Sequence, residues 1–307
     1  MTGFLTELGK RMAERWVALL VLPGLVFTAV ATVAVVLGHD RWADTGLLLK
    51  WSTDLGGTVG GNRPVPTAFL LIGVLAASVA SAFVARALAT PYEALLLGRW
   101  PFFLSRPAEA LTRRRKEAWR RHDRRHVAAE ATGEAGAVGE EAPDDEAPGD
   151  DQVSAEAAEA RNRIALVEPS LPTWTGDRMR APAARVRGQY LLDLGVAWPR
   201  LWLLLPETTR EPLTEARQRF DDATTLGGWA VLYTALGALW WPGVVVGAAV
   251  ALVAWRRVRA AADTYAELVE AAVDVHVDDL LAHFDDEFRP VRPHAGARVT
   301  ERFRKGM

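Results

Sequence analysis

The chain has 307 residues, of which 50% are hydrophobic and 24% are charged, and its formal net charge at pH 7 is −2. It contains no cysteine, which excludes disulfides, thiolate catalysis and cysteine-ligated zinc or iron–sulfur centres. Apolar and charged residues are segregated along the chain, and the long apolar stretches indicate an integral membrane protein.

Two long apolar stretches lie in the N-terminal third, at about residues 16–38 and 66–89. Each meets the ~20-residue length that a helix needs to cross a ~30 Å hydrocarbon core. The first is longer than the ~7–15-residue apolar region of a signal peptide, and no A-x-A site follows it, so we expect a retained signal anchor. Region 1–100 is therefore predicted to hold two transmembrane helices, joined by a short, solvated external loop at 39–65.

Region 101–222 divides by charge into three parts. Residues 107–130 are rich in Ala, Arg and Glu and predict a basic helix. Residues 131–153 are mostly Gly, Ala, Pro, Glu and Asp without apolar periodicity, so they cannot bury a core and are expected to form a disordered acidic linker. Residues 154–222 are predicted to hold a helix and a membrane-docking elbow, because the Trp- and Leu-rich run 198–205 is too short to span and would lie in the interface plane.

A third apolar region, 223–256, is interrupted at Trp241-Pro242-Gly243. Proline cannot donate to a helix ladder, so this tripeptide predicts a turn and the region a hairpin. Each arm of roughly 15 residues reaches only ~22 Å, so a full crossing needs local thinning or a longer helix, and a re-entrant hairpin is the alternative. Residues 257–307 are predicted to form a cytoplasmic C-terminal helix and tail.

Basic residues beside the apolar stretches predict the orientation. They precede the first stretch and follow the second and third, whereas 39–65 is poorer in them, and such residues favour the cytoplasmic side. We expect a multi-pass protein of the plasma membrane with both termini in the cytoplasm. Strand signals are weak throughout, so the predicted fold class is all-α and polytopic, with two N-terminal spans plus a C-terminal helical hairpin.

Several basic side chains are candidates for contact with anionic lipid headgroups or another anionic ligand. Juxtamembrane Lys and Arg gain ~1 kcal/mol each at an anionic surface, and the position of the block at 113–116 after a membrane exit favours lipid or topogenic roles over nucleic acid. A purely structural or topogenic role is the alternative for the others. The candidates are Arg113, Arg114, Arg115, Lys116, Arg178, Arg180 and Arg200.

The C-terminal helix carries residues at alternating spacings of four and three, which is typical of a coiled-coil seam. Such a seam would be buried by the basic helix or by a second copy of the chain. The last of its residues is a histidine, which could respond to pH or be a tolerated seam residue. The predicted oligomer seam consists of Val258, Ala262, Tyr265, Val269, Ala272 and His276.

Two residue pairs have the i, i+4 spacing of metal-binding helices. His122 and His126 lie among arginines, which repel a cation, and Asp279 with His283 is typical of a solvated acidic helix face. The sequence has no phosphate-binding loop, nucleophile elbow or Rossmann glycine pattern. We therefore predict no metal, no cofactor and no enzymatic activity.

One segment before the predicted hairpin resembles a known group of sequences. It resembles uncharacterised multi-pass membrane proteins of high-GC actinobacteria, and the resemblance implies a shared topology and no reaction. The chain departs from their pattern after Arg180-Ala181, where Pro182 and Ala183 replace the usual Glu. The matching positions are Pro172-Thr173, Gly176-Asp177, Arg180-Ala181, Tyr190 with Asp193, and Trp198-Pro199-Arg200-Leu201.

Two function classes follow from these features. The first is a membrane scaffold or sensor whose cytoplasmic helices recruit an unknown protein partner. The alternative is a subunit of an oligomeric pore or transport component, formed by several copies of the chain. No ionisable residue lies near the centre of a predicted span, which argues against a coupled transporter. The expected partners are the lipid bilayer and a protein, and not nucleic acid.

Overall fold

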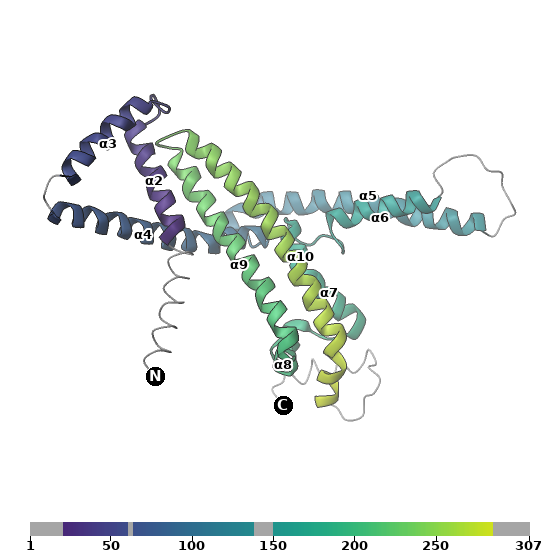
Figure 1. Ribbon diagram of the computed structural model, residues 1–307. Coiled ribbons are helices and arrows are strands. Elements are labelled where there is room, and N and C mark those ends of the chain that lie inside the picture. Colours follow the sequence, from purple (N-terminus) through teal and green to yellow (C-terminus); the bar gives the residue numbers. More distant parts are fainter. Residues whose placement is uncertain (1–20, 61–63, 138–149, 285–307) are drawn as a thin grey trace. The chain divides into compact units, whose positions relative to one another are not determined.

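The computed structural model describes residues 21–60, 64–137 and 150–284, and every regular element in these ranges is a helix (Figure 1). The prediction of an all-α fold is confirmed. The α-helices are α2 (Leu22–Leu37), α3 (Thr45–Gly60), α4 (Pro64–Leu96), α5 (Ser105–Ala137), α6 (Asp150–Ile164), α7 (Trp174–Tyr190), α8 (Leu194–Leu204), α9 (Glu207–Leu236) and α10 (Pro242–Phe284), and η2 (Phe102–Leu104) is a 3-10 turn.

The chain forms two compact units, each assembled from separate stretches of sequence. The first unit comprises Met1–Tyr92 and Asp221–Arg257, and the second comprises Glu93–Phe220 and Val258–Met307. The unit boundaries therefore fall inside α4, α9 and α10. The four consecutive regions expected from the sequence are in space two discontinuous units, one collecting the long apolar segments and the other the charged ones.

In the first unit, α4 contacts its neighbours through small side chains. A Cβ atom on Gly24 of α2 would lie 2.1 Å from the backbone oxygen of Ser78, and one on Gly228 of α9 would lie 2.0 Å from that of Ala85. Glycine is needed at both positions because the backbones approach so closely, as is common between membrane helices. The buried face of α4 consists of Ser78, Ala82, Ala85 and Ala89.

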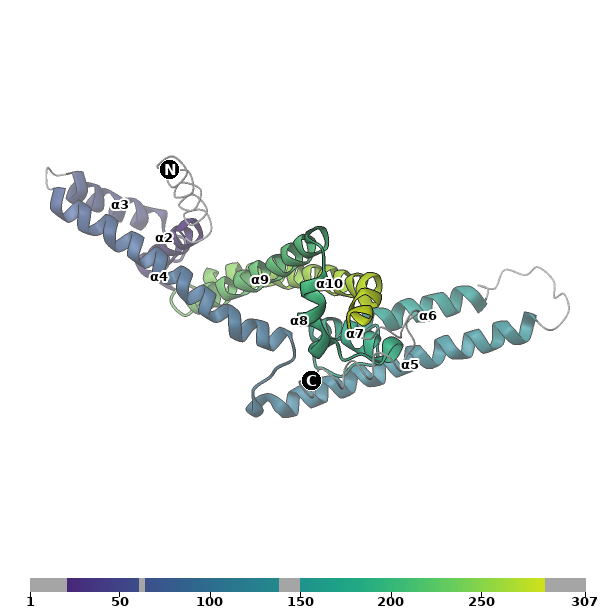
Figure 2. The same cartoon turned by 90° about the horizontal axis from the view of Figure 1, so that it is seen from below.

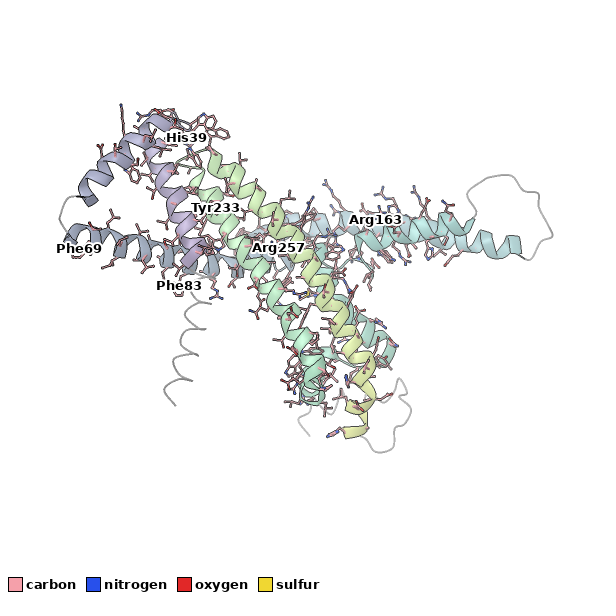
Figure 3. The ribbon with its side chains drawn as sticks, in the orientation of Figure 1. His39, Phe69, Phe83, Arg163, Tyr233 and Arg257 are labelled. Atoms are coloured by element: carbon pink, nitrogen blue, oxygen red, sulfur yellow. The ribbon has the colours of Figure 1, made fainter. Side chains whose placement is uncertain are left out.

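Aromatic side chains fill the remaining space between α2 and α9. The ring of Phe27 on α2 lies 5.8 Å from that of Trp229 and 5.2 Å from that of Tyr233 on α9, measured between centroids. Figure 3 marks Tyr233 on α9. These aromatic residues form the core of the first unit together with two alanines of the small α4 face.

The residues after α2 contact the turn between α9 and α10. The Nδ1 atom of His39 lies 2.9 Å from the carbonyl oxygen of Leu239, and the indole nitrogen of Trp240 donates to the carbonyl of Trp42 over 3.1 Å. The rings of Trp42 and Trp241 meet edge to face at 5.0 Å. Both connections therefore lie at the same end of the first unit (Figure 1).

The turn predicted at Trp241-Pro242-Gly243 occurs slightly earlier in the chain: α9 ends at Leu236, residues 237–241 make the turn, and Pro242 and Gly243 begin α10. The expectation of two short arms is wrong. Helix α9 has 30 residues and α10 has 43, because the polar segments on both sides of the apolar region continue the same helices. The separate C-terminal helix expected from residue 257 is the second half of α10, and residues 285–307 lie outside the described residues.

Three other boundaries differ from the expectation. The loop expected at 39–65 contains α3, which begins where the Asp44 carboxylate accepts from the backbone N–H of Leu47 at 3.0 Å and continues through a Leu-rich run. The basic helix expected at 107–130 is confirmed as α5 and is longer. It takes in the start of the expected linker, where Ala and Glu favour helix, and α6 takes in the end of the linker. Residues 138–149 lie outside the described residues.

The second unit consists of an antiparallel hairpin and a helical core. Helices α5 and α6 lie side by side along the hairpin (Figure 2). Helices α7 and α8 and the adjoining parts of α9 and α10 share one apolar core, in which Val186, Leu201, Leu213 and Val273 are each at most 2% exposed. This core holds α7 against α10 and so positions the charged groups described below.

Helix α4 provides one segment, Thr67–Leu96, that is long and apolar enough to cross a membrane, and no second such helix occurs among the described residues. The next apolar helix, α2, has 16 residues, and residues 1–20 of the predicted signal anchor are outside the described part. The core helix of a soluble protein, or a signal sequence, can be equally long and apolar, so one such helix does not by itself establish insertion into a membrane. The polytopic arrangement therefore stays a prediction.

Candidate functional site

A buried cation in the second unit, Arg178, lies on the face of α7 that packs against α10. Its side chain is 4% exposed. The guanidinium donates from Nε to Asp263 and from Nη1 to Glu270 at 3.0 Å, and Glu267 lies 3.9 Å away. Burial lowers the pKa of Arg178, but its hydrogen bonds to Asp263 and Glu270 prevail and the pKa is raised. The buried cation is therefore fully charged and fully paired.

A second arginine and a tyrosine extend the same network along α7. Arg185 donates to Glu270 at 3.0 Å and to Asp274 at 2.8 Å, and the Tyr190 hydroxyl donates to Asp274 at 3.2 Å. Burial and the negative charge of Asp274 raise the pKa of Tyr190. The paired acidic residues of α10 are Asp263, Glu270 and Asp274. Because their spacings are seven and four, they lie on one face of α10, opposite the arginines of α7.

Asp177 organises the connection that leads into α7. One carboxylate oxygen accepts from the backbone N–H groups of Ser170 and Leu171, both at 2.9 Å, and the other accepts from Arg115 of α5 at 2.5 Å. Arg115 also donates to the carbonyl oxygens of Leu171, at 2.6 Å, and of Ile164, at 2.8 Å. One ion pair therefore fixes the end of α6, the connection and the start of α7 together.

Residues 172–201 position the helices of this arrangement. Thr173 caps α7 by accepting from the N–H of Gly176 at 3.2 Å, and a Cβ on Gly176 would lie 2.6 Å from the backbone oxygen of Leu97. Asp193 caps α8 by accepting from the N–H of Gly195 at 3.1 Å. These residues position helices and do not point into a reaction site.

A stacked cation lies beside this network. The guanidinium carbon of Arg259 on α10 lies 4.2 Å from the centre of the Trp174 ring. Burial and the positive charge of Arg115 lower the pKa of Arg259. The face of the Trp174 ring compensates part of the desolvation cost of the Arg259 charge, because the ring quadrupole attracts a desolvated cation.

The predicted anion-binding residues do not form one site. Arg178 and Arg115 are occupied by carboxylates of the same chain, and Arg200 donates to the carbonyl of Val196 in its own helix. Among the remaining candidates, Lys116 is half-buried. The exposed ones are Arg113, Arg114 and Arg180. Sequence reasoning missed the carboxylates on α10, whose regular spacing opposite the α7 arginines was the available signal.

The outer face of α5 is basic and exposed. Arg106, Arg113 and Arg124 are seven and eleven residues apart and so lie on one side of the helix, away from the side that carries Arg115. Arg120 on this side pairs with Glu168 at 2.7 Å. Arg106 and Arg113 have no carboxylate partner within the described part of the chain. This face can therefore attract an anionic surface.

The residues of the predicted oligomer seam lie in the chain's own core. Val258, Ala262, Val269 and Ala272 are buried, and Val269 and Ala272 belong to the apolar core shared with α7 and α8. Tyr265 is half-buried against that core. The seam spacing therefore predicted a buried face correctly but assigned it the wrong partner. His276 is half-buried, and its Nδ1 atom lies 3.2 Å from Asp279.

The predicted membrane-docking elbow is also partly core. Leu201 and Leu205 are 1% and 2% exposed, and Trp198 and Trp202 pack against the same apolar cluster. Leu203 alone among these residues is strongly exposed, at 79%. The run forms α8 and covers α10, because its apolar side chains recur at helical spacing.

The described residues contain no group of three or more His, Asp or Glu that could hold a metal ion. His126 instead contacts the hydroxyl of Ser154 through Nδ1 at 2.9 Å. Of two surface hollows, one is lined by charged side chains of α5 and the other by α8 and α9, and each is open to solvent. Comparisons with protein-family models, curated proteins and solved structures find no significant match to this chain.

Proposed function

We propose that this protein is a multi-pass scaffold of the plasma membrane that holds a rigid, charged helical unit at the cytoplasmic surface and recruits a protein partner there. The observation that carries the proposal is the exposed apolar surface of α4. Only 17% of its most apolar 18-residue stretch is buried, whereas the core helix of a soluble protein would be mostly buried. Phe69 and Phe83 are 70% and 55% exposed on α4 (Figure 3).

The other apolar helices of the first unit support the same proposal. Val35 on α2 is 69% exposed and Val245 on α10 is 57% exposed, although both lie in apolar runs. Lipid would cover these side chains, which in water would form a large apolar patch. Helices α9 and α10 are continuous through the apolar region 223–256, and because the apolar part of each is only roughly 15 residues long, the proposed crossing includes local thinning of the bilayer. The resemblance to multi-pass membrane proteins of high-GC actinobacteria is consistent with this topology.

The recruiting surface that we propose is the distal outer face of α5. Arg121, Arg124 and Arg125 are exposed there, and Val127 beside them is 56% exposed. Such a face fits an acidic protein surface, because complementary charge speeds and selects association. The Arg178 network favours a structural role for the second unit, since its buried charges are neutralised by each other. We therefore propose no cofactor and no enzymatic activity.

The absence of cysteine makes single-cysteine labelling the most direct test of the membrane proposal. Nitroxide labels at Phe83→Cys and Val245→Cys should be accessible to oxygen and protected from a water-soluble nickel complex in proteoliposomes. A label at the matched exposed position Arg125→Cys should show the reverse. Nickel access at Val245→Cys would refute the hairpin crossing, and nickel access at Phe83→Cys would refute the membrane location of α4.

A second test concerns the partner. A photoreactive amino acid at Arg125 should capture one cellular protein that the same group at Gln218, an exposed residue of α9, does not capture. Identical capture from both positions would contradict a specific recruiting face.

The alternative function is a subunit of an oligomeric pore or transport component. Native mass spectrometry of the detergent-purified protein separates the two proposals. A ring of four or more copies, with conductance in planar bilayers, would favour the pore. A monomer or dimer without conductance would favour the scaffold.

A further inference from the structure

The turn between α4 and α5 carries two strongly exposed aromatic side chains, which the described part of the chain leaves largely uncovered. Phe102 is 88% exposed and Phe103 is 69% exposed, and their rings meet each other edge to face at 5.8 Å. Other large apolar side chains of the second unit, such as Leu201, Leu213 and Val273, are buried in its core. An exposed aromatic pair in that unit therefore requires an external partner or loses apolar stabilisation.

The surroundings of the pair are basic. Arg99 and Arg106 flank the turn, both are exposed, and Arg113 continues the outer face of α5 two helical turns further on. Within the described part of the chain, no carboxylate pairs with these three arginines. The combination of inserted aromatic rings and flanking arginines is typical of segments that bind the surface of an anionic membrane.

The position in the chain identifies which surface is within reach. The membrane-length segment of α4 ends at Leu96, six residues before Phe102. These six residues span at most about 20 Å. If α4 leaves the bilayer at Leu96, Phe102 is therefore close enough to reach the headgroups. The indole nitrogen of Trp100 donates to the carbonyl of Leu95 at 2.9 Å and so ties the turn to the end of α4.

We infer that this turn is a membrane-surface anchor, in which Phe102 and Phe103 insert at the boundary of the headgroups and acyl chains while Arg99, Arg106 and Arg113 bind anionic headgroups. The anchor fixes the start of α5 at the bilayer. It deepens the proposed function and rests on α4 lying in the membrane. It also separates the roles along α5, because the first turns bind lipid and the distal face remains available for a protein.

The test places an environment-sensitive fluorophore at Phe102→Cys in the full chain, reconstituted into vesicles of phosphatidylcholine with phosphatidylglycerol. Nitroxides at a shallow acyl position should quench this label at least threefold more than a label at Arg125→Cys. A label at Phe83→Cys reports on α4. Quenching at Phe83→Cys without quenching at Phe102→Cys would refute the anchor alone, and absence of quenching at both would refute the proposed function as well.

The charge requirement is tested separately. Replacing Arg99, Arg106 and Arg113 with glutamine in the Phe102→Cys chain should reduce the quenching, and removing phosphatidylglycerol should have the same effect. The matched control replaces three exposed arginines away from the anchor, Arg121, Arg124 and Arg125, with glutamine and should leave the quenching unchanged. A blue-shifted label that lipid nitroxides do not quench would mean that protein covers the turn, which overturns the inference.

Discussion

Replacing Arg178 with alanine removes the cation that joins α7 to the acidic face of α10. The hydrogen bond to Glu270, which is 17% exposed, joins two charged and largely buried groups and is worth about 1.5–3 kcal/mol. Asp263 is 48% exposed and can be rehydrated, so its pair adds only about 0–1 kcal/mol. We therefore expect Arg178→Ala to destabilise the docking of α7 by about 1.5–4 kcal/mol, mostly below the ~3–5 kcal/mol typical of pairs buried on both sides.

Hydrogen–deuterium exchange of α7 peptides in the detergent-purified full chain measures this docking. If exchange follows local opening, α7 amides in Arg178→Ala should exchange about 12- to 700-fold faster, since about 1.4 kcal/mol corresponds to a factor of ten. The matched control is Arg185→Ala, which removes pairs to the same face but starts from a side chain that is 45% exposed. We expect a change of less than about tenfold there.

Equal acceleration in the two variants would refute the reasoning, because burial is the difference on which the magnitude depends. Arg178→Lys should lie between the wild type and Arg178→Ala, since lysine keeps the charge but cannot donate in two fixed directions. If Arg178→Lys exchanges like Arg178→Ala, geometry rather than charge dominates. Unchanged exchange in both Arg178→Ala and Arg178→Lys would show that the apolar core alone docks α7.

Three further predictions concern packing, capping and pH. Gly228→Ala should destabilise the first unit by about 1–3 kcal/mol, because its Cβ would meet the backbone oxygen of Ala85. The control Gly73→Ala meets nothing within 4 Å and should leave the thermal midpoint unchanged or higher. Equal midpoints for the two variants would contradict this prediction. Asp177→Asn should cost about 1.5–3 kcal/mol through the lost charge-assisted hydrogen bonds, read as faster exchange at the start of α7, and unaltered exchange there would count against its organising role. Because the folded-state pKa of Tyr190 is raised, its contribution to stability is complete below the unfolded pKa of about 10 and is lost as pH rises through the folded pKa. Tyr190→Phe should therefore make the thermal midpoint fall less steeply at alkaline pH. An unchanged slope would show that the ionisation of Tyr190 is not linked to stability.

Helix content and the turn at Pro242 could be predicted because their causes are local. Proline removes a backbone donor wherever it stands, and the apolar run beside it has no strand periodicity. The seam on α10 shows where local reasoning ends. The spacing of Val269 and Ala272 correctly indicates a buried face, but a helical period does not name the helix that covers it, and α7 and α8 of the same chain do so here.

The arginines show the same limit for charge. Arg115 and Arg178 stand beside Arg113 and Arg180 in the sequence and look equally available for an anion. The structure pairs the first two with carboxylates and leaves the other two exposed. Their partners are separated by 62 residues and more, so sequence proximity carries no information about the pairing.

The sequence by itself determined that the chain is helical, that apolar and charged segments alternate along it, and that cysteine chemistry is absent. These properties depend on backbone preferences and on side-chain composition, which act over a few residues. Only the tertiary structure decided that the segments assemble into two discontinuous units and which arginines remain exposed. Those outcomes depend on which distant faces bury each other, because burial sets whether a charge must find a partner in the protein or can stay in water.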